Sequence, residues 1–110
     1  MGRPPLDLGR FAEPALLILI SLAEGPRHGY AMMEDIAGFS ATRIGPGTLY
    51  GAIARLEERG LIAAVPTDDR RQPYRLTPDG RAALQEHLAG MTQVTAAGLQ
   101  RLNENGSTPS

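Results

Sequence analysis

The side chains in this sequence best suited to chemistry are arginines, and the chemistry they suit is phosphate binding. All eleven basic residues are Arg, and two of them, Arg70 and Arg71, are adjacent in the turn-forming segment Thr67–Pro73. A guanidinium group offers paired N–H donors that match phosphate oxygens, and a narrow DNA groove concentrates negative potential. The pair is therefore a candidate DNA contact; the alternative is a solvated turn in which both arginines pair with Asp68 and Asp69.

A second polar group surrounds the segment Gly45-Pro-Gly-Thr-Leu-Tyr50. Thr48 and Tyr50 place hydroxyl groups near the front of a predicted helix, where such groups often hold phosphates, although Tyr50 also fits a core position. Arg43 and Arg55 fit phosphate or base contacts, the alternative being surface ion pairs with nearby glutamates. The residues expected to contact DNA are Tyr30, Arg43, Gly47, Thr48, Tyr50, Gly51, Arg55, Arg70 and Arg71.

Catalytic and metal-binding patterns are missing from the sequence. His28 and His87 are far apart, without further ligands at metal-binding spacing, and there is no Cys. Ser21 lies in an apolar stretch with neither a nucleophile elbow nor a base. The glycines at 45 and 47 lack the third glycine, the preceding strand and the Lys of a nucleotide loop. We therefore expect no enzyme, no cofactor and no metal.

Apolar spacing and turn signals indicate how these residues are positioned. They predict helices over residues 12–23, 28–39 and 46–59, strands over 61–65 and 74–77, and a last helix from Thr77 to about 102. Pro46 suits a first helical position and Gly60 a helix end. Thr77 is expected to cap the last helix. The pattern is that of a mainly α (α+β) winged helix-turn-helix: three helices, a two-stranded wing with the arginine pair at its tip, and a long C-terminal helix.

The third predicted helix divides into two faces. Three apolar residues at helical spacing are expected to pack inward: Leu49, Ile53 and Leu56. The opposite side is expected to carry Thr48, Gly51, Ala52 and Arg55.

Four segments follow from this pattern. The two ends are rich in Pro, Gly and polar residues, which predicts poor order there. We expect a flexible N-terminus over 1–11, a winged-helix DNA-binding domain over 12–78, a dimerisation helix over 79–102 and a disordered tail over 103–110.

The last predicted helix carries an apolar stripe that must be buried against another surface. Its members recur at spacings near 3.5 residues: Leu84, Leu88, Met91, Val94, Leu99 and Leu102. Such a stripe is typical of a helical seam between two chains, the alternative being that the helix folds back on its own core. We therefore expect a homodimer.

Composition and charge agree with one small DNA-binding domain. The 110 residues are 42% apolar, enough for a single modest core. The net charge is -1, but residues 43–75 hold six Arg against four acids, which makes the middle of the chain mildly basic between acidic ends. The longest apolar run is too short for a membrane span, and no signal peptide is evident, so we expect a cytoplasmic protein without a membrane partner.

Several motifs, in this order, resemble the PadR family of bacterial transcriptional regulators: His28-Gly-Tyr30, Pro46-Gly-Thr-Leu-Tyr50, Arg55-Leu-Glu-Glu-Arg-Gly-Leu-Ile62 and Tyr74-Arg-Leu-Thr-Pro-Asp-Gly80. The resemblance covers about residues 12–102 and is closest to short members with one C-terminal helix. It implies a winged-helix dimer that represses promoters and often releases DNA on binding a small molecule. Pro73 and Gly51 depart from the family pattern; we expect Pro73 to shorten the second wing strand.

The leading hypothesis is a homodimeric repressor that binds double-stranded DNA at a pseudo-palindromic operator. The alternative is a winged-helix module that binds another protein and not DNA. A small hydrophobic or aromatic effector is expected in an apolar cleft where the first and last helices approach each other. The residues expected near that cleft are Leu16, Leu19, Leu88 and Met91.

Overall fold

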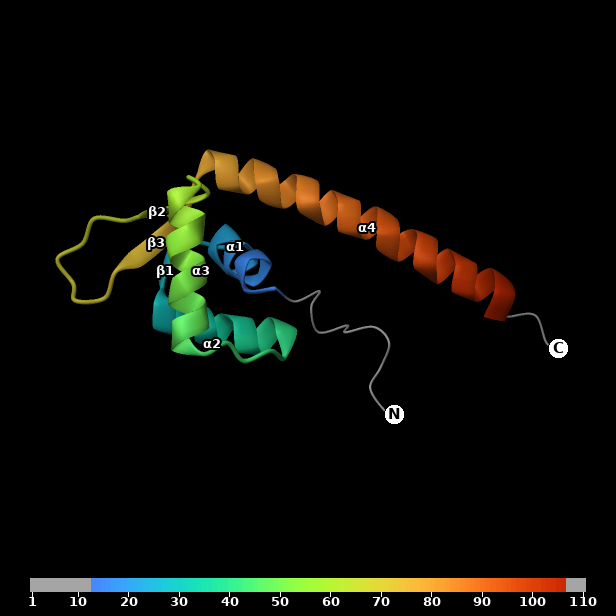
Figure 1. Ribbon diagram of the computed structural model, residues 1–110, viewed down its shortest axis with the longest axis horizontal. Helices are drawn as coiled ribbons and strands as arrows, with labels where there is room; N and C mark the ends of the chain where they lie inside the picture. The colour runs from blue at the N-terminus through green and yellow to red at the C-terminus, as the bar shows by residue number, and fades with distance from the viewer. Residues whose placement is uncertain (1–12, 107–110) are drawn as a thin grey trace.

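The computed structural model describes residues 13–106, which form four helices and three short strands (Figure 1). The order is α1 (Pro14–Ala23), β1 (Arg27–His28), α2 (Gly29–Ser40), α3 (Pro46–Glu58), β2 (Ile62–Ala64), β3 (Pro73–Leu76) and α4 (Pro78–Gly106). The winged helix-turn-helix predicted from the sequence is confirmed. The predicted flexible N-terminus and the last four residues of the predicted tail lie outside the described residues.

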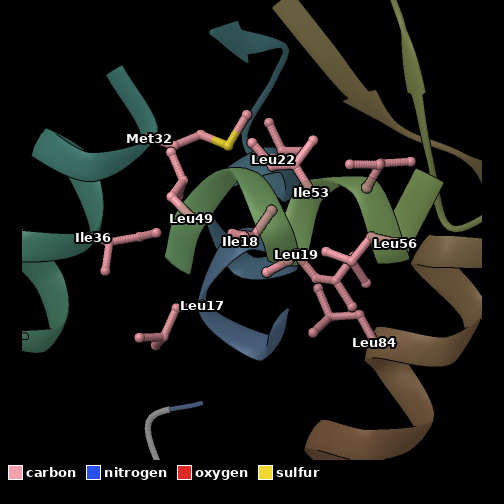
Figure 2. Close-up of a cluster of buried hydrophobic side chains, with 12 residues drawn as sticks. Leu17, Ile18, Leu19, Leu22, Met32, Ile36, Leu49, Ile53, Leu56 and Leu84 are labelled. Atoms are coloured by element: carbon pink, nitrogen blue, oxygen red, sulfur yellow. The ribbon is translucent and has the colours of Figure 1, made fainter. Parts of the chain in front are cut away.

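The core lies where α1 to α3 meet (Figure 2). α1 is its central element, because Leu17, Ile18 and Leu22 are almost fully buried. Its apolar side chains contact those of α2 and α3; the fully buried members from these two helices include Met32, Ile36 and Leu49. The core therefore fixes α3 against α1 and leaves its outer face free.

α3 begins and ends at the residues that the sequence indicates. Pro46 occupies the first turn, where a backbone N–H has no helical acceptor. At the other end Gly60 has φ +76°, which glycine adopts at little cost. The N–H of Gly60 donates to the carbonyl of Glu57, and that of Leu61 to the carbonyl of Leu56. This double closure ends the helix and turns the chain directly into β2.

The small sheet has one strand more than predicted. β3 is its central strand, with β1 on one side and β2 on the other, both antiparallel. β1 is two residues long and shows no alternating pattern of its own, so only its pairing with β3 makes it a strand. Pro73 does not shorten β3, because the strand begins at this residue. A first strand position tolerates the missing N–H, and the carbonyl of Pro73 still accepts from Val65.

α4 leaves the domain as a long single helix (Figure 1). It continues to Gly106, beyond the end predicted at 102, because residues 103–105 contain neither Gly nor Pro to break it. The radius of gyration is 17.2 Å, against about 13 Å for a compact chain of this length. Among the described residues, the second half of α4 therefore has few neighbours from its own chain.

The start of α4, in contrast, belongs to the winged domain. Leu84 is only 5% exposed and lies in the core cluster, and Leu88 is partly buried against it. Figure 2 shows Leu84 pointing toward Leu56 of α3. The structure thus places Leu84 in the core of its own chain and not on an open stripe, because the first turns of α4 pack against the domain before the helix departs.

Candidate nucleic-acid interface

The outer face of α3 carries most of the polar residues that the sequence singled out. Thr48, Tyr50 and Arg55 are exposed, whereas Leu49 and Ile53 are buried as predicted. Ala52 was expected on the outer side, but its exposed fraction is 1%, so that prediction is wrong. Ala52 comes three residues after Leu49 and four before Leu56, so helical spacing itself puts it beside the buried stripe.

Tyr50 of α3 lies across the first turn of α2. A Cβ atom on Gly29 would overlap the Tyr50 hydroxyl and would stand 2.9 Å from its Cε1 atom. Only glycine permits this approach without displacing the ring. Tyr50 is 50% exposed, so it is a surface residue held by α2 and not the core residue that the sequence left as an alternative.

The wing loop is shaped by its own polar side chains. Thr67 Oγ1 accepts from the Asp69 N–H, and Asp69 Oδ1 accepts from the Arg70 N–H, both at 3.0 Å. Gln72 Nε2 donates to the carbonyls of Val65 and Pro73, at 2.9 and 2.7 Å, and so ties the two sides of the loop together. The arginine backbones are thereby fixed while their side chains stay exposed.

Arg71 turns back from the wing toward α2. Its Nη1 lies 3.4 Å from His28 Nε2. His28 caps α2, since its Nδ1 accepts from the Ala31 N–H at 3.3 Å. With Nδ1 as acceptor, a neutral ring carries its proton on Nε2, so this is a contact between two donors. The guanidinium N–H groups of Arg71 therefore remain available for another acceptor.

Two adjoining hollows connect the predicted DNA-contacting residues. The first, of about 530 Å³, lies between the wing and the helices and is lined by His28, Gly29, Tyr30, Tyr50, Arg70, Arg71 and Gln72. The second, of about 300 Å³, lies beside the α2–α3 connection and is lined by Tyr30, Met33, Glu34, Arg43, Ile44 and Gly45. Tyr30 lines both hollows, so the surface is continuous from Arg43 to the wing. Gly47, Thr48 and Arg55 are exposed outside them.

The arginines of this surface were candidates for ion pairs with nearby carboxylates. Among residues 13–106, none of Arg43, Arg55, Arg70 and Arg71 forms an ion pair; the ion pairs shown involve Arg27. The alternative pairings with Asp68, Asp69 or the α3 glutamates are therefore not observed. Partial burial, with Glu57 and Tyr50 nearby, raises the pKa of Tyr74 above its usual 10.0. This phenol thus adds no negative charge at neutral pH.

Comparison with known proteins decides the family. Residues 18–86 match the model of the transcriptional regulator PadR-like family. The chain belongs to the PadR family. It is 39% identical over 86 residues to the transcriptional regulator Rv3488 of Mycobacterium tuberculosis, an alignment covering 76% of this chain and 79% of that protein. It is 41% identical over 86 residues to an uncharacterized 37.1 kDa protein in transposon TN4556 of Streptomyces fradiae, covering 78% of this chain but only 25% of that protein.

Solved structures of similar proteins support the same fold. A PadR-family regulator from Eggerthella lenta is 32% identical, with a TM-score of 0.69 and coverage of 86% of this chain and 85% of the other. A transcriptional regulator from Clostridium thermocellum is 28% identical, with a TM-score of 0.73 and coverage of 86% and 97%. PadR membership makes this protein a transcriptional regulator and not an enzyme, and it implies DNA binding.

This PadR protein also uses residues that sequence reasoning missed. His28, considered from the sequence only as a metal ligand, caps α2 and lies beside Arg71. Buried Ser21 donates to Asp35 at 2.7 Å, and Arg27 donates to the Ser21 carbonyl at 2.9 Å, which joins α1, β1 and α2. The motif His28-Gly-Tyr30 could have indicated the cap by His28 and the close contact at Gly29, because its residues are adjacent. The Ser21 network could not be predicted, because it joins residues up to 14 positions apart.

In residues 13–106, no helix combines the length and apolar content needed to cross a membrane. The same part of the chain contains no cluster of three or more His, Asp or Glu residues able to hold a metal ion.

Proposed function

We propose that this PadR-family protein is a homodimeric, cytoplasmic repressor that binds a pseudo-palindromic operator through α2, α3 and the wing. The observation that carries the proposed surface is the continuity of the two hollows through Tyr30, with Arg43 at one end and Arg70 and Arg71 at the other. Unpaired guanidinium groups on one continuous surface fit a row of phosphates. In this arrangement α3 enters the major groove and the wing contacts the backbone or the minor groove.

Gly51 is consistent with close approach of DNA to α3. A helix-interior glycine costs up to about 1 kcal/mol relative to Ala. A Cβ atom at this position would meet only Arg55 Nη1, at 3.7 Å, so nothing within the domain requires glycine here. Close approach of a DNA backbone to α3 would explain why this position is glycine.

The proposed dimer rests on the exposed half of α4. Val94 is 73% exposed, Leu99 58% and Leu102 69%, all on a helix that has left its domain. Covering these side chains with a second copy removes apolar surface from water, which is favourable at about 25 cal/mol per Å². A two-fold dimer would place two recognition helices on half-sites about one helical turn, or roughly 10 bp, apart.

A salt series tests DNA binding through the wing. The Arg70→Ala, Arg71→Ala double variant should bind all duplexes more weakly, and the slope of log affinity against log salt should flatten by at most about two contacts. The duplex is first selected with the wild-type protein from a random-sequence pool, and binding is measured by fluorescence anisotropy.

The matched control removes two other exposed arginines, Arg59 and Arg81, which line neither hollow. This control should keep the wild-type salt slope. Equal slopes for all three proteins would mean that the wing does not contact DNA. If the wild-type protein binds no duplex even at low salt, the protein-binding alternative gains support instead.

We further propose that a small hydrophobic or aromatic effector releases the operator. Support comes from a mostly apolar hollow of about 840 Å³ along α4, lined among others by His87, Met91 and Val94. Its described lining residues all lie on α4 and none on α1, so it differs from the predicted cleft between the first and last helices. Of the four residues expected near the effector, Met91 lines this hollow; Leu16 and Leu88 are partly buried against the core, and Leu19 is buried within it.

The effector is tested with phenolic acids, cationic drugs and apolar metabolites. A true effector should raise the melting temperature and weaken operator binding in the same titration, because it must bind the DNA-incompetent dimer more tightly. Met91→Gln should reduce both responses, and Ala96→Gln, exposed on the same helix, should reduce neither. No response from any compound class would contradict the effector proposal and leave DNA binding untouched.

A further inference from the structure

The start of α4 is fastened to the end of α3 by a small polar joint. The Thr77 N–H donates to the carbonyl of Leu61 at 3.1 Å, and Thr77 Oγ1 donates to the carbonyl of Gly60 at 2.6 Å. The same Oγ1 accepts from the Gly80 N–H at 3.0 Å, which caps α4. Thr77 therefore binds the turn that ends α3, the proposed recognition helix, and also caps the start of α4.

Gly80 lets α4 rest directly on the backbone of that turn. It is buried, and a Cβ atom here would overlap the carbonyl oxygen of Leu61 and stand 3.0 Å from Leu76 Cδ1. The obstacle is mainly backbone, which cannot swing aside as the end of a long side chain can. An alanine at this position must therefore push α4 away from β2 or shift the turn itself.

A second attachment fixes the direction of α4. Leu84 lies four residues after Gly80, about one helical turn, and is buried in the core. Two attachments one turn apart hold a helix axis more firmly than one. Leu88 is also partly buried against the core. Further along, Val94 and Leu99 are exposed, so the joint, Leu84 and Leu88 together determine where the rest of α4 points.

We propose that Thr77 and Gly80 are positioning residues that set the angle between α3 and α4, and through it the spacing of the two half-sites that a dimer can bind. This inference rests on the proposed dimer. α3 has 13 residues, so it is about 20 Å long, and a tilt of about 10° at the joint moves its far end by about 3.5 Å. In a two-fold dimer the separation then changes by up to about 7 Å, or roughly two base-pair steps.

The test uses variants that alter only the joint. Gly80→Ala introduces the overlap, and Gly38→Ala is the matched control, because a Cβ atom at that helical glycine meets nothing within 4 Å. Thr77→Val removes the hydroxyl while keeping the shape of the side chain, and Thr77→Ser restores it. The threonine pair keeps the proposal testable if Gly80→Ala does not fold.

The first readout is the distance between the recognition helices. The chain has no Cys, so Thr48→Cys, exposed near the start of α3, gives one spin label per subunit in the DNA-free dimer. Gly80→Ala should shift the mean distance by several ångströms and Thr77→Val by a smaller amount. Gly38→Ala and Thr77→Ser should keep the wild-type distance.

The second readout is the operator itself. Proteins without the label are used to select duplexes from a random-sequence pool. Gly80→Ala should enrich half-sites one or two base pairs closer or farther apart than the wild type does. It should also bind the wild-type operator about tenfold or more weakly, as expected when a half-site loses the contacts of one base pair.

The outcomes separate this inference from the proposed function. Changed distance and changed spacing, with dimerisation retained, would support the joint. A dimer in which Gly80→Ala and Thr77→Val keep the wild-type distance and spacing would overturn this inference alone. A monomeric wild-type protein, which gives no distance between subunits, would overturn both.

Discussion

Replacing Val94, Leu99 and Leu102 together by Gln is expected to give a folded monomer that no longer holds its operator. These side chains are exposed within the chain, so the change should remove little of the packing inside one domain. Simultaneous binding at two half-sites, however, requires that the two subunits are joined in one dimer. Losing the link should weaken operator affinity by about 10²-fold or more, since the second half-site is then no longer bound within one complex.

Light scattering and operator titration measure the two effects separately. The control places Gln at Ala89 and Ala96, which are exposed on the same helix but lie off the stripe; this protein should stay dimeric and bind as the wild type does. Circular dichroism should show an intact fold in both. A triple variant that remains dimeric, or a wild-type chain that is monomeric at micromolar concentration, would contradict the proposed seam.

Leu84→Ala and Leu99→Ala are expected to fail in different ways, although the sequence placed both residues on one stripe. Leu84 is 5% exposed inside the core and Leu99 is 58% exposed. Truncating the buried leucine should cost about 2–5 kcal/mol of folding free energy, a large part of the roughly 5–15 kcal/mol of a typical domain. Truncating Leu99 should leave the single chain stable within about 0.5 kcal/mol and weaken only the dimer.

Denaturation at several protein concentrations distinguishes these cases. Dimer dissociation depends on concentration and the unfolding of one chain does not. Leu84→Ala should therefore lower the midpoint by a similar amount at every concentration. The loss from Leu99→Ala should be near zero where the wild type is also monomeric and should grow as the protein is concentrated, because only then does the wild-type dimer add stability. A loss from Leu84→Ala that vanishes at low concentration, as expected for Leu99→Ala, would contradict the core position of Leu84. Because Leu84 and Leu88 pack against the core of their own chain, a truncation that tests the dimer has to begin after Met91.

Features set by neighbouring residues could be predicted from the sequence by itself. Pro46 and Gly60 delimit α3 because a missing N–H and a positive φ are local properties. Leu49 and Ile53 face inward because they share one side of a helix. The ordered motifs indicate the family, and the arginine pair at the wing tip follows from the turn between two strands. None of these inferences requires a distant part of the chain.

Only the tertiary structure decided which helices, strands and side chains contact one another. β1 exists only because β3 pairs with it, and Leu84 is buried because the start of α4 packs against the core of the domain. Tyr50 crosses Gly29, and Thr77 reaches the end of α3, through contacts between segments that are distant in the sequence. Helical periodicity gives the face on which a residue lies but not the neighbour that the face meets, and so the stripe of α4 could not show where core ends and open surface begins.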